Sequence, residues 1–116
     1  MTMLQFGLSA NTVGKLHSVL AKHPNVERAV VYGSRAKGNF RNGSDIDLSL
    51  SAAPGTQIDH RELGLILDEI DDLLLPYTVD ICVFEQMNNP ALREHIERVG
   101  KVLYERGTQP QTAPNP

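Results

Sequence analysis

The stretch GSRAKGNFRNGSDIDLSL, residues 33–50, contains the pattern that decides the fold. Residues 45–51 alternate strictly between polar and apolar, as expected for a β-strand with one buried face. Ile46, Leu48 and Leu50 point to one face, and Asp45, Asp47, Ser49 and Ser51 point to the other. Residues 33–44 have three glycines and no apolar periodicity, which predicts a loop with room for one short helical turn.

Helices and strands flank this stretch on both sides. Before it, the sequence predicts a helix capped by Ser9 and ended by His23-Pro24, and then a strand over Val26–Tyr32. After it, the predicted elements are a helix over 58–75, a strand over 77–84, a helix from Asn89-Pro90 to Gly100 and a short edge strand over 102–104. The apolar face of the helix over 58–75 carries Leu63, Ile66, Leu67, Ile70 and Leu74, whereas its other face is acidic.

This order of elements predicts an α/β fold, with a small mixed β-sheet and flanking helices. The strand–helix–strand unit over 45–84 should form a right-handed parallel crossover, so the starts of its two strands lie side by side. If the strand Val26–Tyr32 runs antiparallel to the one that follows it, its end reaches the same edge. One site would then collect Gly33, Ser34, Asp45, Asp47 and Asp80.

Composition bounds the class of protein. The chain has 116 residues, 41% of them apolar and 22% charged, which suits one globular domain. We assign residues 1–106 to that domain and expect 107–116, which carry three prolines and no charge, to be a disordered tail. No apolar run is long enough to cross a membrane, and no signal peptide is visible. A single cysteine, Cys82, fits a reducing cytoplasm.

Charge argues against a polynucleotide partner. The net charge is −3, and the acidic face of the helix over 58–75 would repel a phosphate backbone.

The acids of the predicted site suit a divalent cation. Asp45 and Asp47 lie two residues apart on one strand, about 6.6 Å along it, and face the same way. Carboxylates held this close repel one another, and Asp80 from the next strand increases the repulsion. Mg²⁺ relieves it, because this ion takes one or two carboxylates together with water and substrate phosphates. Three carboxylates can hold two such ions about 3.5–4 Å apart, as in-line phosphoryl displacement requires.

Plainer explanations of the same residues stay open. Asp45 and Asp47 can simply form the wet face of an edge strand. Asp80 interrupts an otherwise apolar strand, where a buried acid costs several kcal/mol unless it is paired. A salt bridge to Arg35 or another arginine would satisfy it. Gly33 lets the backbone approach a phosphate, but the loop glycines can also serve turns alone.

The same residues resemble a known signature. The pair Gly33-Ser34, ten further residues, the run Asp45-Ile46-Asp47 and an Asp on a later apolar strand are similar to the motif of the polymerase-beta-type nucleotidyltransferase superfamily. The similarity extends over roughly residues 8–106, and no motif position departs from the pattern. The short length resembles the minimal nucleotidyltransferase branch, which keeps the catalytic core and lacks added domains.

The resemblance implies a role for each motif residue. Asp45 and Asp47 would bind two Mg²⁺ ions and the nucleotide phosphates, and Asp80 would bind the catalytic metal and help to activate the acceptor hydroxyl. Gly33 and Ser34 would hold the β- and γ-phosphates. Arg35 would contact a phosphate or pair with the acids. The implied reaction is attack of a hydroxyl on the α-phosphate of ATP or another NTP, with release of pyrophosphate.

The resemblance also implies a partner. Members of the minimal branch are typically paired with a small all-helical protein of the HEPN or substrate-binding type, to one of whose tyrosines the antitoxin-like nucleotidyltransferase adds AMP. We therefore expect a hetero-oligomer in the cytoplasm. Two alternatives are a non-catalytic antitoxin that binds its partner stoichiometrically, and transfer to a small molecule such as an aminoglycoside with a partner-supplied acceptor site.

Overall fold

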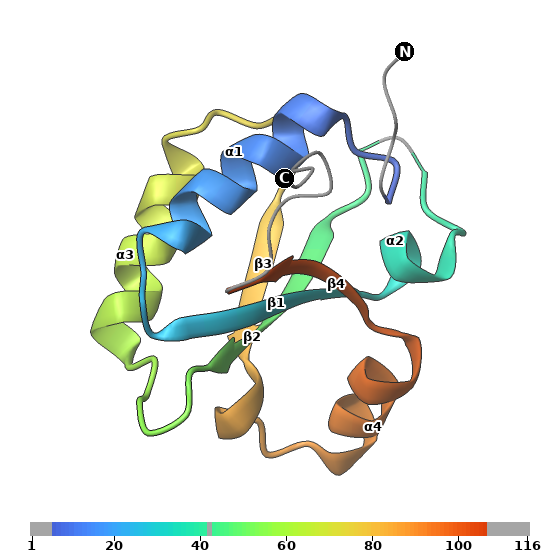
Figure 1. The fold of residues 1–116 in the computed structure, drawn as a ribbon. Coiled ribbons are helices and arrows are strands. Elements are labelled where there is room, and N and C mark those ends of the chain that lie inside the picture. The colour runs from blue at the N-terminus through green and yellow to red at the C-terminus, as the bar shows by residue number, and fades with distance from the viewer. Residues whose placement is uncertain (1–5, 42, 107–116) are drawn as a thin grey trace, which may run out of the picture.

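The computed structural model describes residues 6–41 and 43–106 (Figure 1). Within them the elements follow in the order α1 (Ala10–Ala21), β1 (Val26–Tyr32), α2 (Ser34–Lys37), β2 (Ile46–Ala52), α3 (His60–Asp71), β3 (Val79–Val83), a 3₁₀ turn (Phe84–Gln86), α4 (Pro90–Val99) and β4 (Lys101–Glu105). The described strands form one sheet in the order β3-β2-β1-β4. The pair β2–β3 is parallel and the other two pairs are antiparallel. The predicted α/β fold with a small mixed sheet is confirmed.

The core lies between the sheet and the helices α1 and α3 (Figure 1). On β2, Ile46, Leu48 and Leu50 are completely buried, as their alternation predicts. They join Leu16 and Leu20 of α1 and the buried residues of α3 in one apolar cluster. In Figure 1, α4 lies on the side of the sheet away from α1, where Gly100 at its end lies close to the Val30 side chain of β1.

Most predicted boundaries are confirmed because a cap sets them. The Ser9 side chain accepts a hydrogen bond from the Thr12 amide at the start of α1. Asn89 does the same for the Leu92 amide, with Pro90 as the first helical residue of α4. Gly100 ends α4, and the short α2 occupies the loop where one helical turn was expected.

The prediction for α3 was too long at both ends. Asp59 caps the helix by accepting from the Glu62 amide, so Ile58 lies before it. The helix ends at Asp71, and the chain then turns through Leu74, whose φ is +55°. Leu74 is 86% exposed and does not share the buried face, contrary to the periodicity. The strand predicted over 77–84 is also shorter, because Phe84 begins the 3₁₀ turn.

Other expectations are tested only in part. The predicted tail, residues 107–116, lies outside the described residues, so its disorder and the domain boundary at residue 106 stay predictions. Among the helices that the structure describes, none is both long and apolar enough to pass through a membrane.

Candidate active site

The sheet register brings the predicted acids together. Asp47 on β2 pairs with Asp80 on the parallel strand β3 and with Tyr32 at the end of the antiparallel strand β1. The three residues form one row across the sheet, on the face opposite the completely buried residues of β2. Asp45 immediately precedes β2, and Gly33 immediately follows β1. The expected strand arrangement is therefore confirmed, with β1 antiparallel and β3 parallel to β2. It brings Asp47, Asp80 and Gly33 to one end of the sheet.

Gly33 lies directly against Asp47. Its backbone has φ +76° and ψ −152°, a combination open essentially only to glycine. A Cβ placed on Gly33 would lie 2.6 Å from an Oδ2 atom of Asp47, which is inside van der Waals contact. Ser34 follows as the first residue of α2 and is partly exposed. A glycine is thus required here both by the backbone angle and by the carboxylate beside it.

The negative charges of Asp45 and Asp80 act on the Asp47 carboxylate. Burial raises the pKa of Asp47, and the negative charges of Asp80 and Asp45 raise it further. Burial also raises the pKa of Tyr32, with smaller contributions from the thiol of Cys82 and from the two acids in its row. In the part of the chain that the structure describes, none of the ion pairs includes these acids. The electrostatics at this point of the sheet therefore favour a cation.

Asp80 is exposed, and the expectation that it lies in a buried strand was wrong. The reason is the position of β3 at the edge of the sheet, where only β2 is paired with it. An acid at an edge can keep part of its hydration, so it needs no salt bridge to be tolerated. The alternative explanation for Asp80 was an ion pair with an arginine. Among the described residues, no arginine forms such a pair with it.

Arg35 supports the loop instead of pairing with the acids. Its side chain is 3% exposed, and its guanidinium donates to the Ser44 carbonyl from Nε (3.1 Å) and Nη2 (2.9 Å) and to the Phe6 carbonyl from Nη1 (2.8 Å). It lies between the rings of Phe40 and Tyr77, 5.0 and 4.8 Å from their centroids. The expected ion pair is therefore not formed, and these contacts hold the chain just before Asp45. A phosphate contact from Arg35 stays a prediction.

The donors fit a divalent cation by chemistry. Among residues 6–41 and 43–106, no three acidic, histidine or cysteine side chains are already drawn together around one metal position. However, Asp47 carries the repulsion of both other acids, and carboxylate oxygens are the hard ligands that Mg²⁺ takes. An ion of this kind needs only one or two protein carboxylates, because water and substrate phosphates complete its shell. Asp45, Asp47 and Asp80 are the residues that would hold it.

Sequence analysis missed the residues beside the acids. The Tyr32 hydroxyl lies 3.7 Å from the Cys82 sulfur, and the Tyr32 ring packs edge-on against His95 of α4, with centroids 6.4 Å apart. Ser49, expected on a wet face, is 1% exposed, and its hydroxyl has no partner in the described structure. The explanation that Asp45 and Asp47 form the wet face of an edge strand does not hold, because β2 is a central strand of the sheet. The alternation in β1 and β2 was the available signal, but the packing of α4 was not predictable from it.

Comparison with known proteins decides the family. A family model described as "Polymerase beta, Nucleotidyltransferase" matches residues 14–109. The chain belongs to this nucleotidyltransferase family. The family is named for nucleotidyl transfer. The acids beside Gly33 are the part of this chain suited to that reaction. A search of curated proteins found no match.

Solved structures show the same fold. A toxin–antitoxin complex with AMP-PNP is 20% identical, with 82% of this chain and 74% of that chain covered and a TM-score of 0.66. A tri-AMPylated HEPN toxin in complex with an MNT antitoxin, from Shewanella oneidensis, is 18% identical, with coverages of 82% and 71% and a TM-score of 0.61. A putative nucleotidyltransferase from Sulfolobus solfataricus is 18% identical, with coverages of 81% and 77% and a TM-score of 0.53. At these identities the likeness is one of fold.

Proposed function

We propose that this nucleotidyltransferase transfers AMP from ATP, with Mg²⁺, to a tyrosine hydroxyl of a HEPN-type partner protein, and thereby acts as an antitoxin in the cytoplasm. The observation that carries the proposal is the pairing of Asp47 with Asp80 on adjacent parallel strands, with Asp47 held against Gly33. The likeness to toxin–antitoxin complexes, one of which contains a HEPN toxin, supports the choice of partner.

The residues of the chain have distinct tasks in this reaction. Asp45, Asp47 and Asp80 would hold Mg²⁺, which when bound neutralises charge on the triphosphate. Gly33 leaves room for the Asp47 carboxylate, which a larger side chain would displace, and the Ser34 hydroxyl can donate to a phosphate oxygen. Asp80, exposed at the sheet edge, can accept the proton of an incoming hydroxyl at its Oδ atoms. The hydroxyl oxygen bonds to the α-phosphorus, the bond to the bridging oxygen breaks, and pyrophosphate leaves.

A protein acceptor is favoured over a nucleic acid. The outer face of α3 is acidic and would oppose a phosphate backbone. Asp80 lies on the edge strand β3, with Asp47 beside it on β2, so the acids are close to an edge of the sheet that no other strand covers among the described residues. An acceptor carried by another molecule can therefore reach them from outside.

The experiment is intact-mass measurement of the proposed partner, taken as the product of the neighbouring gene, after incubation of both proteins with ATP and Mg²⁺. We expect a mass gain of one AMP or a multiple, which is lost with EDTA and in the double variant Asp45→Asn/Asp47→Asn. Asp72→Asn, an exposed acid outside the site, serves as the matched control and should transfer normally. A stable complex without any mass gain would contradict the proposal and favour a stoichiometric binder.

A further inference from the structure

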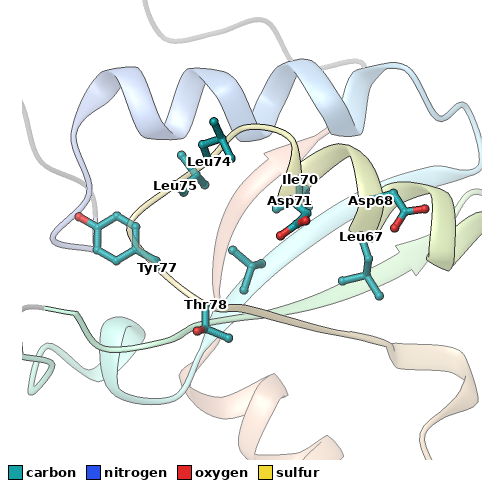
Figure 2. Close-up of a pocket in the computed structure, with 9 residues that line it drawn as sticks. Leu67, Asp68, Ile70, Asp71, Leu74, Leu75, Tyr77 and Thr78 are labelled. Atoms are coloured by element: carbon teal, nitrogen blue, oxygen red, sulfur yellow. The ribbon is translucent and has the colours of Figure 1, made fainter.

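An open groove with both apolar and polar lining lies between the end of α3 and the start of β3. Its volume is about 480 Å³, and Leu67, Leu74, Tyr77 and Val79 provide the apolar part of the lining, with Asp68 and Asp71 on the α3 side. Figure 2 shows these side chains, apart from the unlabelled Val79, arranged around the hollow, with Tyr77 opposite Leu67. Ile70 belongs to the core and Tyr77 packs against it, but Leu67 and Leu74 are not part of the core cluster, so the core does not explain these two leucines.

Leu74 is the most unusual residue of the groove. It is 86% exposed, and its backbone has a φ of +55°, in the left-handed region that glycine and asparagine adopt far more easily than leucine. Leu67 in the same groove is 37% exposed. A leucine at position 74 therefore stabilises neither the turn nor the solvent-exposed surface of the free chain. Its presence indicates a contact with another molecule.

The groove adjoins the candidate active site. Its lining ends at Val79, the residue before Asp80, and the Thr78 carbonyl accepts a hydrogen bond from the Ile46 amide at the start of β2. The Tyr77 ring also packs on the guanidinium of Arg35, which holds the loop before Asp45. A molecule seated in the groove therefore lies at the edge strand that carries Asp80, on the α3 side of the sheet, and can reach Asp80 around that edge.

Charge selects the occupant. A second copy of this chain, joined about a two-fold axis, would bring Asp68 and Asp71 toward their own copies in a chain of net charge −3. A helix with an apolar stripe and flanking Lys or Arg residues instead matches both the leucines and the acids. We propose that the groove is the docking site for such a basic amphipathic helix of the partner protein. This inference rests on the proposed function for the identity of the partner.

The test measures the affinity of the partner for variants of this chain, without nucleotide. The probe is the proposed partner, taken as the product of the neighbouring gene, and the measurement is isothermal titration calorimetry. Leu74→Asn suits the left-handed turn, so we expect it to fold and to raise Kd at least tenfold. Leu65→Asn, on α3 and 50% exposed but outside the groove, is the control and should bind as the wild type does.

The charge contribution is tested in the same way. Asp71→Lys should raise Kd at least tenfold, whereas Glu97→Lys, the same charge change on the exposed surface of α4, should leave Kd within about twofold. The inference is overturned if Leu74→Asn and Asp71→Lys both bind as tightly as the wild type. It is also overturned if the free chain sediments as a dimer that Leu74→Asn dissociates, because the occupant is then a second copy.

The outcome separates the docking site from the reaction. If groove variants lose affinity but the bound partner gains no AMP from the wild type, the docking site stands and the proposed transfer fails. If the partner gains AMP and the groove variants bind it normally, the transfer stands and the docking site fails.

Discussion

The contact between Gly33 and Asp47 makes Gly33→Ala an informative perturbation. The substitution adds one methyl group at a backbone with φ +76° and ψ −152°, a region whose strain for other residues is about 1–3 kcal/mol. The new Cβ would lie 2.6 Å from the Oδ2 atom of Asp47. We therefore expect a moderate loss of stability together with a displaced carboxylate.

Gly33→Ala should lower stability and catalysis to different extents, because backbone strain affects stability whereas the displaced carboxylate affects the reaction. The carboxylate must move by about 0.8 Å to reach ordinary contact at 3.4 Å, the difference between 3.4 and 2.6 Å. It is the far end of a side chain, so the movement costs little stability beyond the strain. However, a displacement approaching 1 Å at a reacting centre lowers turnover by about 100-fold. Catalysis should thus fall far more than stability.

The assay compares kcat for AMP transfer with urea unfolding of the same variants. Gly38→Ala is the matched control, because Gly38 also has a positive φ of +86° but nothing lies within 4 Å of its added Cβ. We expect Gly38→Ala to lose about 1 kcal/mol and to keep nearly the wild-type kcat. Equal kcat values for the two variants would refute the reasoning, since the position of Asp47 would then not limit the reaction.

Three further predictions concern charge and support. Burial and neighbouring acids raise the pKa of Asp47 above 3.8, so the free energy of unfolding should fall as the pH rises from 3.8 through the folded pKa. The free energy of unfolding of Asp47→Asn, measured with urea, should change less with pH across that window. A pH dependence equal to that of the wild type would contradict the prediction. His23 bonds Glu62 and Glu69 through its two ring nitrogens, so His23→Ala should lower the free energy of unfolding by about 1.5–3 kcal/mol. The substitution His60→Ala, at an exposed histidine, should cause no comparable loss. Arg35→Lys should lose about 2–3 kcal/mol of stability with little change in the KM for ATP; a raised KM at wild-type stability would instead indicate a phosphate contact.

Local patterns predicted the elements that depend on neighbouring residues. The alternation over Asp45–Ser51 identified both faces of β2, because the period of a strand is set by the backbone itself. Ser9 and Asn89 identified helix starts, because a cap bonds an amide three residues away. The parallel pairing of β2 with β3 followed from the intervening helix, and it brought Asp47 beside Asp80.

Features that depend on distant packing were not predictable in the same way. Leu74 continues the apolar period of α3, but the helix ends before it, since periodicity does not show where packing stops. The apolar run around Asp80 suggested a buried strand, whereas strand order alone decides which strand lies at an edge. Arg35 bonds a carbonyl 29 residues away in sequence, a contact that no local pattern contains.

The edge position of β3 connects these differences. An acid buried completely within the sheet would need a partner within the chain, and its charge would then be satisfied before any substrate arrived. At an edge, Asp80 stays exposed while its neighbour Asp47 is half-buried against Gly33. One carboxylate is therefore positioned by the fold, and the other is accessible from outside it. A small chain can in this way supply a nucleotide site without enclosing the acceptor, provided that another molecule brings the hydroxyl to the edge.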